Sequence, residues 1–581
     1  MSDLQMKEIQ DAINNEDFKS AEILLQKYLN DTSWYNDMIA LFQAAVREHY
    51  GDRDGMWEAI QKGLLHNCRN YELYIMLGNY YLEKNPYQSY LCYENAIFHC
   101  KDAEDKAIIE RLLIQFTEQY NIKVEKAAII ILSYDLLTYT KACIMSIRNT
   151  TPESAREIIV VDNGSKDGSV EWLREQPDVI LLENKENKGF PGGCNQGIKA
   201  SSKGSDIFLL NNDTILPENA LFWLRMGLYD SEDNGAAGSV SNCAGGQNCC
   251  QWDDNVDARE MLRFGEQTNI PMRYPYEDRL FLVGFALLIK RLAIERTGLL
   301  DERFFPGNNE DVDLGLRIIK AGYRNVLCKN SFILHFGSKT FEKDMEGFKA
   351  TAKRNRKKIN EKWGFDIDYQ LHPKTMLIDL IEVSMENPIC ILDVGCGCGA
   401  SMGYIRGRYP NAKTYGIERD PEMAEIASRM GEVLCGDVEK IKLPWGPEYF
   451  DYILLGDMLE HLKEPEETLK KLRIYLKPDG HIILDALNVK HYSVIIPLLE
   501  QDVFSYSDMG ILQKTHTRMY TGEELKNIVM RSGYEMEKLN GIIMERPENQ
   551  KAQLIKDIAC VMGGIENERF LIYRYCLRAK K

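Results

Sequence analysis

The stretch that most constrains the fold is Asp206-Ile-Phe-Leu-Leu-Asn-Asn-Asp213, an apolar run that ends in a polar cluster with one carboxylate at its end. A buried strand that ends in an aspartate is how many α/β enzymes place a metal ligand at the carboxyl edge of a sheet. A strand followed by an ordinary Asn/Asp turn would show the same residues without any chemistry. The stretch therefore predicts an α/β domain and makes Asp213 a candidate ligand of a divalent cation.

The length and charge of the chain limit what surrounds this stretch. With 581 residues, the chain is expected to form about three or four domains, each able to bury its own core. The formal charge of -17 argues against a nucleic acid as the main partner, because phosphate binding needs a basic face. An anionic small substrate stays compatible, because a metal or a local cationic site can act inside an acidic protein.

The sequence shows no sign of export or membrane insertion. Its longest apolar runs, such as residues 281–289, are shorter than the roughly 20 residues of a transmembrane helix. The N-terminus is polar and does not resemble a signal peptide. The 15 cysteines form no regular framework and are expected to be reduced thiols. We therefore expect a cytoplasmic protein with no transmembrane segment.

Residues 1–122 have a helical pattern, with apolar residues three and four apart. The clearest repeat begins at Tyr71-Glu-Leu-Tyr-Ile-Met-Leu-Gly-Asn-Tyr-Tyr81 and continues to Ala96, with weaker echoes upstream. It resembles a tetratricopeptide repeat that is one residue short in its turn. The resemblance implies a concave surface for a protein or glycan acceptor. A plain helical bundle that supports the next domain is the alternative.

Residues 123–345 alternate strand and helix patterns. The run that begins at Lys126 and ends at Ser133-Tyr134-Asp135, a helix, and then Glu157-Ile-Ile-Val-Val-Asp162 predict a parallel βαβ unit. A glycine-rich turn with Gly192 and Gly193 precedes the next helix, where the backbone can approach a ligand and the helix N-terminus favours a phosphate. A turn of this kind is weak evidence when it stands alone.

The order of several short motifs in this region is more specific. The motifs are Ser133-Tyr134, Val161-Asp-Asn-Gly-Ser165, Asn187-Lys-Gly-Phe190 with Asn195, Asn211-Asn212-Asp213, Gly298-Leu-Leu-Asp-Glu-Arg-Phe-Phe305, Glu310-Asp311-Val-Asp313, Ala321-Gly-Tyr323 and His335. Their order resembles that of family-two inverting glycosyltransferases with the GT-A fold, in the rhamnosyltransferase-like branch.

This resemblance assigns roles to individual residues. It implies that Ser133 and Asp162 hold the nucleotide base, and that Asp213 and His335 bind a divalent metal, Mn or Mg. Asn211 replaces the first aspartate of the family's Asp-x-Asp motif, as it does in this branch, which lowers the charge at the metal. The candidate residues for binding the nucleotide sugar are Ser133, Asp162, Gly193, Asn195, Asn212 and Asp213.

Sugar transfer also needs a base for the acceptor hydroxyl, and a carboxylate can serve. Asp311 is our candidate for that base, with Glu310 in reserve. Acidic residues are also favoured in the first turn of a helix by the helix dipole, so a purely structural role explains both as well.

Residues 346–372 are predicted to be a helical linker, whose basic stretch 353–358 is most simply a solvated helix face. Residues 373–581 then begin a new α/β pattern. Ile389-Cys-Ile-Leu-Asp393 is a strand that enters the glycine-rich turn Val-Gly395-Cys-Gly397-Cys-Gly399. The turn alone also satisfies a dinucleotide-binding fingerprint, so it does not name the cofactor.

Spacing narrows the choice of cofactor. Acidic residues at strand ends recur at Asp393, Glu418, Asp437 and Asp457, in steps of 19 to 25 residues, which is one strand plus one helix. With Leu476-Lys-Pro-Asp-Gly480, this region resembles a class I S-adenosylmethionine-dependent methyltransferase with a Rossmann-like fold. The resemblance implies that S-adenosylmethionine is bound by Asp393, Gly395, Gly397, Gly399, Glu418, Asp437, Val438 and Asp457.

The methyl acceptor needs a base if it is a hydroxyl. His461 and His516 are candidates, the second within a His-x-Arg-x-x-Thr segment that is typical of related sugar and small-molecule methyltransferases. A structural role is equally compatible with each histidine.

Together these features predict a multidomain chain: a helical repeat domain, a GT-A glycosyltransferase domain and a class I methyltransferase domain. Such a chain would use a nucleotide-sugar donor and a protein or glycan acceptor that the repeats could hold, and would methylate the same glycan. The alternative is a repeat-bearing scaffold in which only one transferase domain, or neither, is active.

Overall fold

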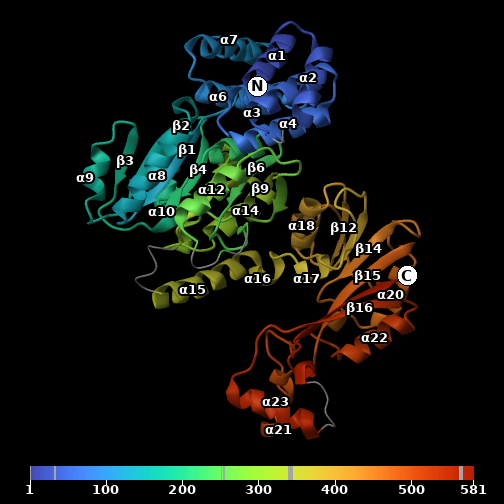
Figure 1. Cartoon of the computed structure of the whole chain (residues 1–581). Coiled ribbons are helices and arrows are strands. Elements are labelled where there is room, and N and C mark those ends of the chain that lie inside the picture. The colour runs from blue at the N-terminus through green and yellow to red at the C-terminus, as the bar shows by residue number, and fades with distance from the viewer. Residues whose placement is uncertain (1, 32–33, 250–251, 253–255, 338–344, 562–566) are drawn as a thin grey trace. The chain divides into compact units, whose positions relative to one another are not determined.

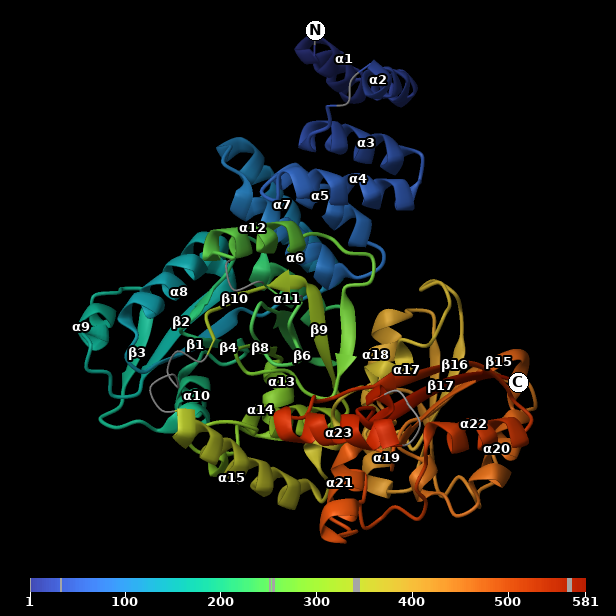
Figure 2. The same cartoon turned by 60° about the horizontal axis from the view of Figure 1, so that its bottom comes forward.

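In the computed structural model, the described residues are 2–31, 34–249, 252, 256–337, 345–561 and 567–581. They form two compact units, Met1–Phe365 and Asp366–Lys581, and each has its own sheet and its own hydrophobic core. Figures 1 and 2 show the elements of each unit in two views. Within the described ranges, no helix combines the length and the apolar character needed to cross a membrane.

The first unit begins with helices that pack against one another in chain order. An Asn or Asp side chain caps the first turn of each helix from α3 to α7, as Asn70 does by accepting from the N–H of Leu73 at 3.1 Å. The helical prediction for residues 1–122 is confirmed, whereas their repeat nature stays a prediction. The helices are α1 Ser2–Asn14, α2 Phe18–Asp31, α3 Asp37–His49, α4 Arg53–His66, α5 Tyr71–Tyr81, α6 Pro86–His99 and α7 Ala103–Tyr120.

The later helices, α4 to α7, share a core with the α/β part of the same unit. Helix α11, Ala220–Leu228, contributes Phe222, Trp223 and Met226 to the apolar cluster of α4, α5 and α6. A buried ion pair joins Arg225 of α11 to Glu94 of α6. Because apolar side chains and a buried ion pair cross the boundary, the helical region is packed onto the α/β region rather than tethered to it.

The α/β part of the first unit is built on an eight-stranded mixed sheet with strand order β3-β2-β1-β4-β8-β6-β9-β7. Strands β1 to β4 are parallel, as the βαβ pattern predicted, and β8 is antiparallel to both β4 and β6. The carboxyl ends of β1, β2 and β4 therefore meet at one edge. The strands are β1 Ala127–Ser133, β2 Arg156–Asp162, β3 Val179–Glu183, β4 Asp206–Asn211, β6 Asn234–Val240, β7 Tyr276–Arg279, β8 Ala286–Ile289 and β9 Arg324–Phe332.

Helices cover both faces of this sheet. One face packs against α8, α9 and α11, and the other against α10, α13 and α14, with α12 at its rim. A separate two-stranded ribbon pairs β5 with β10. The remaining elements are β5 Thr214–Ile215, β10 Leu334–His335, α8 Leu137–Thr150, η1 Glu153–Ala155, α9 Ser169–Arg174, α10 Gly189–Ala200, α12 Ala258–Thr268, α13 Arg291–Thr297, η2 Glu302–Phe304, α14 Glu310–Lys320 and α15 Met345–Trp363.

The second unit contains a seven-stranded sheet with order β13-β12-β11-β14-β15-β17-β16. It is parallel from β13 to β15, and β17 runs antiparallel to both of its neighbours. The order places the ends of β11, β12 and β14 side by side. The strands are β11 Cys390–Val394, β12 Lys413–Glu418, β13 Glu432–Cys435, β14 Phe450–Leu455, β15 Leu476–Leu487, β16 Glu535–Ile542 and β17 Arg574–Lys580.

Helices also cover both faces of the second sheet. Helices α20 and α22 pack on one face, and α17 and α18 on the other, which confirms the Rossmann-like α/β layering. The helices are α16 Ile367–Gln370, α17 Thr375–Ile378, α18 Ala400–Arg408, α19 Pro421–Ala427, η3 Leu459–His461, α20 Pro465–Arg473, α21 Tyr492–Gln501, α22 Gly522–Arg531, α23 Asn549–Val561 and η4 Asn567–Phe570.

Candidate functional site

Asp213 and His335 meet just beyond the end of strand β4. Strand β10 pairs with β5 and sets His335 opposite Thr214, the residue after Asp213. The Nε2 atom of His335 lies 3.2 Å from Oδ1 of Asp213 and 3.3 Å from Nδ2 of Asn211. Both Asp213 and His335 are buried. The fold thus brings together the two residues that the sequence proposed as metal ligands.

The contacts of His335 indicate which of its ring nitrogens carries the hydrogen and which has a lone pair. Its Nδ1 atom lies 2.6 Å from the carbonyl oxygen of Cys243, and its ring stacks on Phe285 with centroids 5.0 Å apart. Because a carbonyl oxygen only accepts, we assign the hydrogen to Nδ1, so a neutral ring presents a lone pair at Nε2. That lone pair faces a carboxylate oxygen, which is also an acceptor. A bound cation, or a proton on Nε2, would make the contact between these two acceptors favourable.

Asp213 and His335 do not form a complete metal centre by themselves. Among the described residues, no three His, Cys, Asp or Glu side chains form a cluster that could hold a metal ion. Mg²⁺ is often bound through one or two carboxylates, with substrate phosphates and water supplying the other ligands. The carboxylate of Asp213 and the lone pair of His335 fit a site in which the protein supplies two ligands and a substrate phosphate and water supply the others.

Ser133 and Asp162 form a second polar pair at the same edge of the sheet. They are the last residues of β1 and β2 and are partners in the strand register. Asp162 Oδ2 accepts from the N–H groups of Gly164 and Ser165 at 3.0 and 2.9 Å. Within the described part of the chain, Asp162 Oδ1 and Ser133 Oγ are buried and have no hydrogen-bond partner. Burying such atoms without a hydrogen bond costs free energy, unless a ligand supplies the missing partner.

Three other candidate residues make contacts that hold the fold together. The amide of Asn195 donates to Leu300 O and to Glu302 Oε1, both at 2.9 Å. Asn212 donates to Thr140 Oγ1 at 3.0 Å. A Cβ atom on Gly193 would lie 2.1 Å from Leu132, so this glycine allows α10 to pack closely on β1. Their contact with a donor stays a prediction.

Glu310 and Asp311 occupy the first turn of α14, as their helix-start pattern predicted. Glu310 is buried, and its Oε2 atom has no hydrogen-bond partner in the described structure. Burial, together with the nearby charge of Asp311, raises the pKa of Glu310 well above its ordinary value. Burial also raises the pKa of Asp311, while hydrogen bonds from the N–H groups of Gly284 and Val312 oppose that rise. Both carboxyls are therefore stronger bases than an exposed one.

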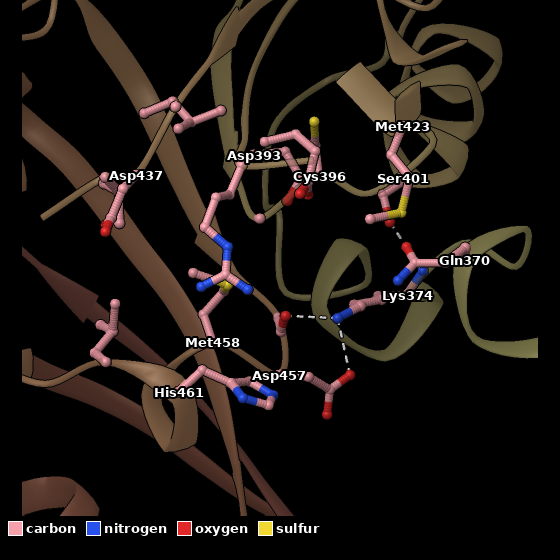
Figure 3. A pocket seen from close by; sticks show the side chains of 18 of the residues that line it. Gln370, Lys374, Asp393, Cys396, Ser401, Met423, Asp437, Asp457, Met458 and His461 are labelled. Carbon is pink, nitrogen blue, oxygen red and sulfur yellow. Dashed lines mark hydrogen bonds and ion pairs between the residues drawn. The ribbon is translucent and has the colours of Figure 1, made fainter. Parts of the chain in front are cut away.

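The second unit contains a cavity of about 330 Å³ above the ends of β11, β12 and β14, a size within the range of small-molecule sites, roughly 300–1,000 Å³. Figure 3 shows part of its lining, with Asp393, Asp437, Asp457 and His461 among the labelled side chains. The predicted residues that line it are Asp393, Gly395, Glu418, Asp437, Val438, Asp457 and His461.

The glycine-rich turn after β11 needs its glycines. Gly395, Gly397 and Gly399 have φ angles of 74°, 54° and 86°, in the left-handed region that favours glycine. A Cβ atom on Gly395 would lie 2.2 Å from the sulfur of Met458, and one on Gly397 would lie 2.0 Å from Gln370 Oε1. At these three positions the backbone conformation therefore disfavours any residue other than glycine.

Acidic residues follow the neighbouring strands at the same edge. Glu418 ends β12 and accepts from the N–H groups of Gly397 and Asp420, both at 2.9 Å. Burial raises the pKa of Asp393 to about 6, although the charge of Lys374 opposes the rise. Burial alone would raise the pKa of Asp437, but hydrogen bonds from the Lys440 side chain and the Glu439 N–H lower it overall.

Asp457 lies in an ion-pair network that the sequence did not predict. Its carboxylate is 2.8 Å from Lys374 Nζ and 2.6 Å from a guanidinium nitrogen of Arg574, and Figure 3 shows Lys374 pointing toward it. Arg574 also pairs with the buried Asp485, whose Oδ1 accepts from the Asp457 N–H at 2.6 Å. Burial opposes ionisation, but Lys374 and Arg574 hold the pKa of Asp457 below its usual range. No spacing rule links Lys374 and Arg574 in sequence.

His461 and His516 lie together, but only His461 lines the cavity. Their ring centroids are 5.0 Å apart. The Nδ1 atom of His461 lies 3.3 Å from Thr515 O, and that of His516 lies 2.9 Å from Ile511 O. Burial and the neighbouring His516 lower the pKa of His461. His461 is therefore neutral near pH 7, with a lone pair at Nε2.

Two family models match separate parts of the chain. The model described as glycosyl transferase family 2 matches residues 128–298, in the first unit, and the model described as methyltransferase domain matches residues 369–539, in the second. Together with glycosyltransferase and methyltransferase relatives, these matches support a transferase enzyme.

Similar proteins cover the two parts separately. (S)-Coclaurine N-methyltransferase from Thalictrum flavum subsp. glaucum is 30% identical over 127 residues, or 20% of this chain and 34% of the relative. Glycosyltransferase AglE from Haloferax volcanii is 26% identical over 201 residues, or 34% of this chain and 62% of the relative. A solved SAM dependent methyltransferase from Aquifex aeolicus shares 17% identity, with a TM-score of 0.26, and the match covers 39% of this chain and 97% of that one. The chain spans 33 to 40% of the length of the first curated relatives.

Proposed function

We propose that the chain is a bifunctional transferase. Its first unit transfers a sugar from a nucleotide-sugar donor to a protein or glycan acceptor, with inversion and with the help of a divalent metal. Its second unit uses S-adenosylmethionine to methylate the same glycan. The two family matches support the two reaction classes. For the sugar-transfer half, the facing acceptors of Asp213 and His335 are the observation that carries the proposal.

Ser133 and Asp162 would hold the nucleotide base. Asp162 Oδ1 needs a hydrogen-bond donor, and Ser133 Oγ can donate or accept. A base edge with one ring N–H beside a carbonyl oxygen, as in uracil or thymine, would donate to Asp162 and accept from Ser133. Both buried atoms would then be paired.

Asp213 and His335 would hold Mn²⁺ or Mg²⁺ beside the diphosphate. When bound, the cation supplies positive charge that offsets the negative charge of the leaving diphosphate. The hydrogen bond from His335 Nδ1–H to Cys243 O would keep its Nε2 lone pair aimed at the metal.

Asp311 would act as the general base of sugar transfer, with Glu310 as the second candidate. The acceptor oxygen bonds to the anomeric carbon as the bond from that carbon to the diphosphate oxygen breaks, and Asp311 takes the hydroxyl proton. The raised pKa of each carboxyl brings its base strength closer to neutral pH, where a general base is most effective.

The cavity of the second unit would hold S-adenosylmethionine, which supplies an electrophilic methyl group when bound. Glu418, at the end of β12, would accept from the ribose hydroxyls, and Asp437 with Val438 would contact the adenine. The glycine-rich turn would let the backbone approach the ligand closely. The position of Glu418 beside that turn carries this half of the proposal.

His461 would be the base for the methyl acceptor. Because it is neutral near pH 7 and lines the cavity, its Nε2 atom can take the proton of a hydroxyl as the acceptor oxygen bonds to the methyl carbon and the sulfur–methyl bond breaks. His516 packs against His461 and is the second candidate.

The helical region would hold the acceptor, and the two transfers would be consecutive: a sugar is attached and then methylated. Because the helices share a core with the sugar-transfer unit, an acceptor held by them would stay with that unit. Methyl-labelled S-adenosylmethionine tests the order. Label in the glycosylated product supports consecutive steps, and label only in unglycosylated material contradicts them.

A screen of nucleotide sugars tests the sugar-transfer activity. Thermal unfolding of the chain is measured with each nucleotide sugar and Mn²⁺, with and without a chelator, because a bound donor raises the unfolding temperature by mass action. We expect stabilisation that disappears in chelator, and release of nucleoside diphosphate once an acceptor is added. Binding without any turnover across acceptor preparations would favour the scaffold alternative.

A further inference from the structure

Helix α15, Met345–Trp363, lies against the loop that leads to the candidate catalytic carboxylates. Figures 1 and 2 both place it beside α10 and α14 in the first unit. Residues of α15 make polar contacts with residues 301–313, which include η2 and the first turn of α14. The contacting residues of α15 are Arg354, Asn355, Lys358, Lys362 and Trp363.

Asn355 makes the central contact of this set. Its side chain is fully buried, with 0% of its surface exposed. Its Nδ2 atom donates to the carbonyl oxygens of Phe304 at 2.6 Å and Gly307 at 2.7 Å. One amide therefore bridges both ends of the turn that precedes Asn308 and Asn309, whose φ angles of 78° and 75° are in the left-handed region. A non-glycine residue in that region is strained and needs support from its surroundings.

The end of α15 holds the first turn of α14. Asp313 is fully buried, and its Oδ1 atom accepts from Trp363 Nε1 at 3.1 Å and pairs with Lys362 Nζ at 2.6 Å. Lys362 also pairs with Asp301 at 2.9 Å. Asp313 is two residues beyond Asp311, so these contacts hold the turn on which the candidate base is mounted.

The other side of the loop rests on α10, which begins at Gly189 and therefore contains Gly192 and Gly193 within the helix, not in a turn before it as the sequence predicted. The N–H of Phe190 donates to Pro306 O at 2.7 Å. Asn195 exchanges hydrogen bonds with Leu300, accepting from its N–H at 3.0 Å and donating to its carbonyl oxygen at 2.9 Å. Hydrogen bonds from both α10 and α15 thus hold the loop.

We infer that α15 supports the sugar-transfer site and that Asn355 is a positioning residue, which fixes the loop before Glu310 and Asp311. This inference rests on the proposed function of that site. Asn355 touches no reacting group; it acts through the carbonyls of Phe304 and Gly307. Its loss should move the base relative to a donor that is bound elsewhere, by Ser133, Asp162 and Asp213. Small misplacements of catalytic groups can lower turnover by about 100-fold.

Asn355→Asp tests this role with little change in side-chain size. It replaces the two N–H donors by an acceptor that faces two carbonyl oxygens. We expect kcat for sugar transfer to fall by about 100-fold while the KM for the donor stays within about twofold. Amide hydrogen exchange should become faster over residues 300–313 and stay unchanged over β1 and β2. Lys357→Ala is the matched control, because Lys357 is exposed on the same helix and, among the described residues, pairs with Glu361 at 3.7 Å.

Trp363→Phe is the second variant if Asn355→Asp fails to fold. It keeps an aromatic ring but removes the donor to Asp313, and a smaller fall in kcat with the same unchanged KM is expected. Turnover equal to that of Lys357→Ala in a folded variant, or unchanged exchange over residues 300–313, would overturn the inference. A wild-type chain that transfers no sugar would refute the proposed function, while the exchange measurement still decides whether Asn355 holds the loop.

Discussion

The two candidate sites differ in where their polar atoms find partners. In the first unit, buried atoms at the sheet edge have no partner in the described structure: Ser133 Oγ, Asp162 Oδ1 and Glu310 Oε2. In the second unit, the cavity residue Asp457 is paired within the protein, with Lys374 and Arg574. The first site leaves these hydrogen bonds to a ligand, whereas the second pairs this carboxylate internally.

This difference indicates what each site should depend on. A site with unpaired acceptors should gain much of its order and stability from the ligand. Each buried acceptor that gains a hydrogen bond no longer carries the free-energy cost of an unpaired polar atom. A site with internal ion pairs should keep its shape without ligand, and its cofactor affinity should depend mainly on the space left by the glycine-rich turn. Substitutions should therefore act on ligand binding and turnover in the first unit, and on shape and stability in the second.

The largest effect is expected from Gly397→Arg, which would alter the glycine-rich turn beside the cavity of the second site. A side chain at Gly397 would meet Gln370 and would need a left-handed φ angle. We expect complete loss of S-adenosylmethionine binding by calorimetry, with sugar transfer unchanged. Gly446→Arg is the matched control, since a Cβ atom there meets nothing within 4 Å. Cofactor binding retained by Gly397→Arg would show that the cavity is not the cofactor site.

Asp311→Asn should lower kcat of sugar transfer by about 10²- to 10⁴-fold, the usual contribution of a general base. Donor binding should be retained, because Asp311 is separate from the residues proposed to hold the nucleotide. The measurement is steady-state turnover together with thermal stabilisation by the donor. Glu310→Gln is made in parallel. If only that variant loses turnover, Glu310 is the base, and if neither does, the scaffold alternative gains support.

Lys374→Met should affect stability and should do so in a pH-dependent way. Lys374 and Arg574 hold the pKa of Asp457 below its usual range. This carboxylate therefore contributes stability that is present above the pKa of an unfolded aspartate, about 3.9, and is lost as the pH falls below it. At pH 7 we expect the variant to lose about 1–3 kcal/mol, since Arg574 still pairs with Asp457.

The unfolding transition of the second unit can be recognised because S-adenosylhomocysteine should shift it. Its midpoint is measured from pH 7 to pH 3 in the wild type and in Lys374→Met, and the difference should shrink on acidification. Lys440→Met is the control: Lys440 is 76% exposed and pairs with Asp437, so its loss should cost less than about 1 kcal/mol. A difference between wild type and Lys374→Met that does not vary with pH would contradict the assigned role of the ion pair.

Local sequence patterns predicted the strand ends on which both sites are built. The apolar run before Asp213 and the recurring strand ends at Asp393, Glu418 and Asp457 follow from strand periodicity, and the structure places them at the carboxyl edges of the two sheets. The meeting of Asp213 with His335 does not follow from periodicity, because it depends on the β5 and β10 ribbon. Only the order of motifs along the chain indicated it.

The remaining contacts depend on tertiary packing, which local patterns in a single sequence do not predict. Lys374 and Arg574 are far apart in the chain and meet only because β17 is inserted beside β15. The basic stretch of α15 was expected to be a solvated face, and Lys353 and Lys357 are indeed exposed. Asn355, between them, is fully buried because the loop of residues 301–309 packs on that side of the helix.

The most direct test of two independent transferase sites is a crossed ligand-binding experiment. Thermal unfolding is measured for Asp213→Ala and Gly397→Arg with UDP plus Mn²⁺ and, separately, with S-adenosylhomocysteine. At a ligand concentration of about 100 times Kd, each intact site should gain about 2.7 kcal/mol. We expect UDP with Mn²⁺ to stabilise Gly397→Arg but not Asp213→Ala, and S-adenosylhomocysteine to do the reverse. Stabilisation of both variants by the same ligand, or of neither variant and not of the wild type, would contradict it.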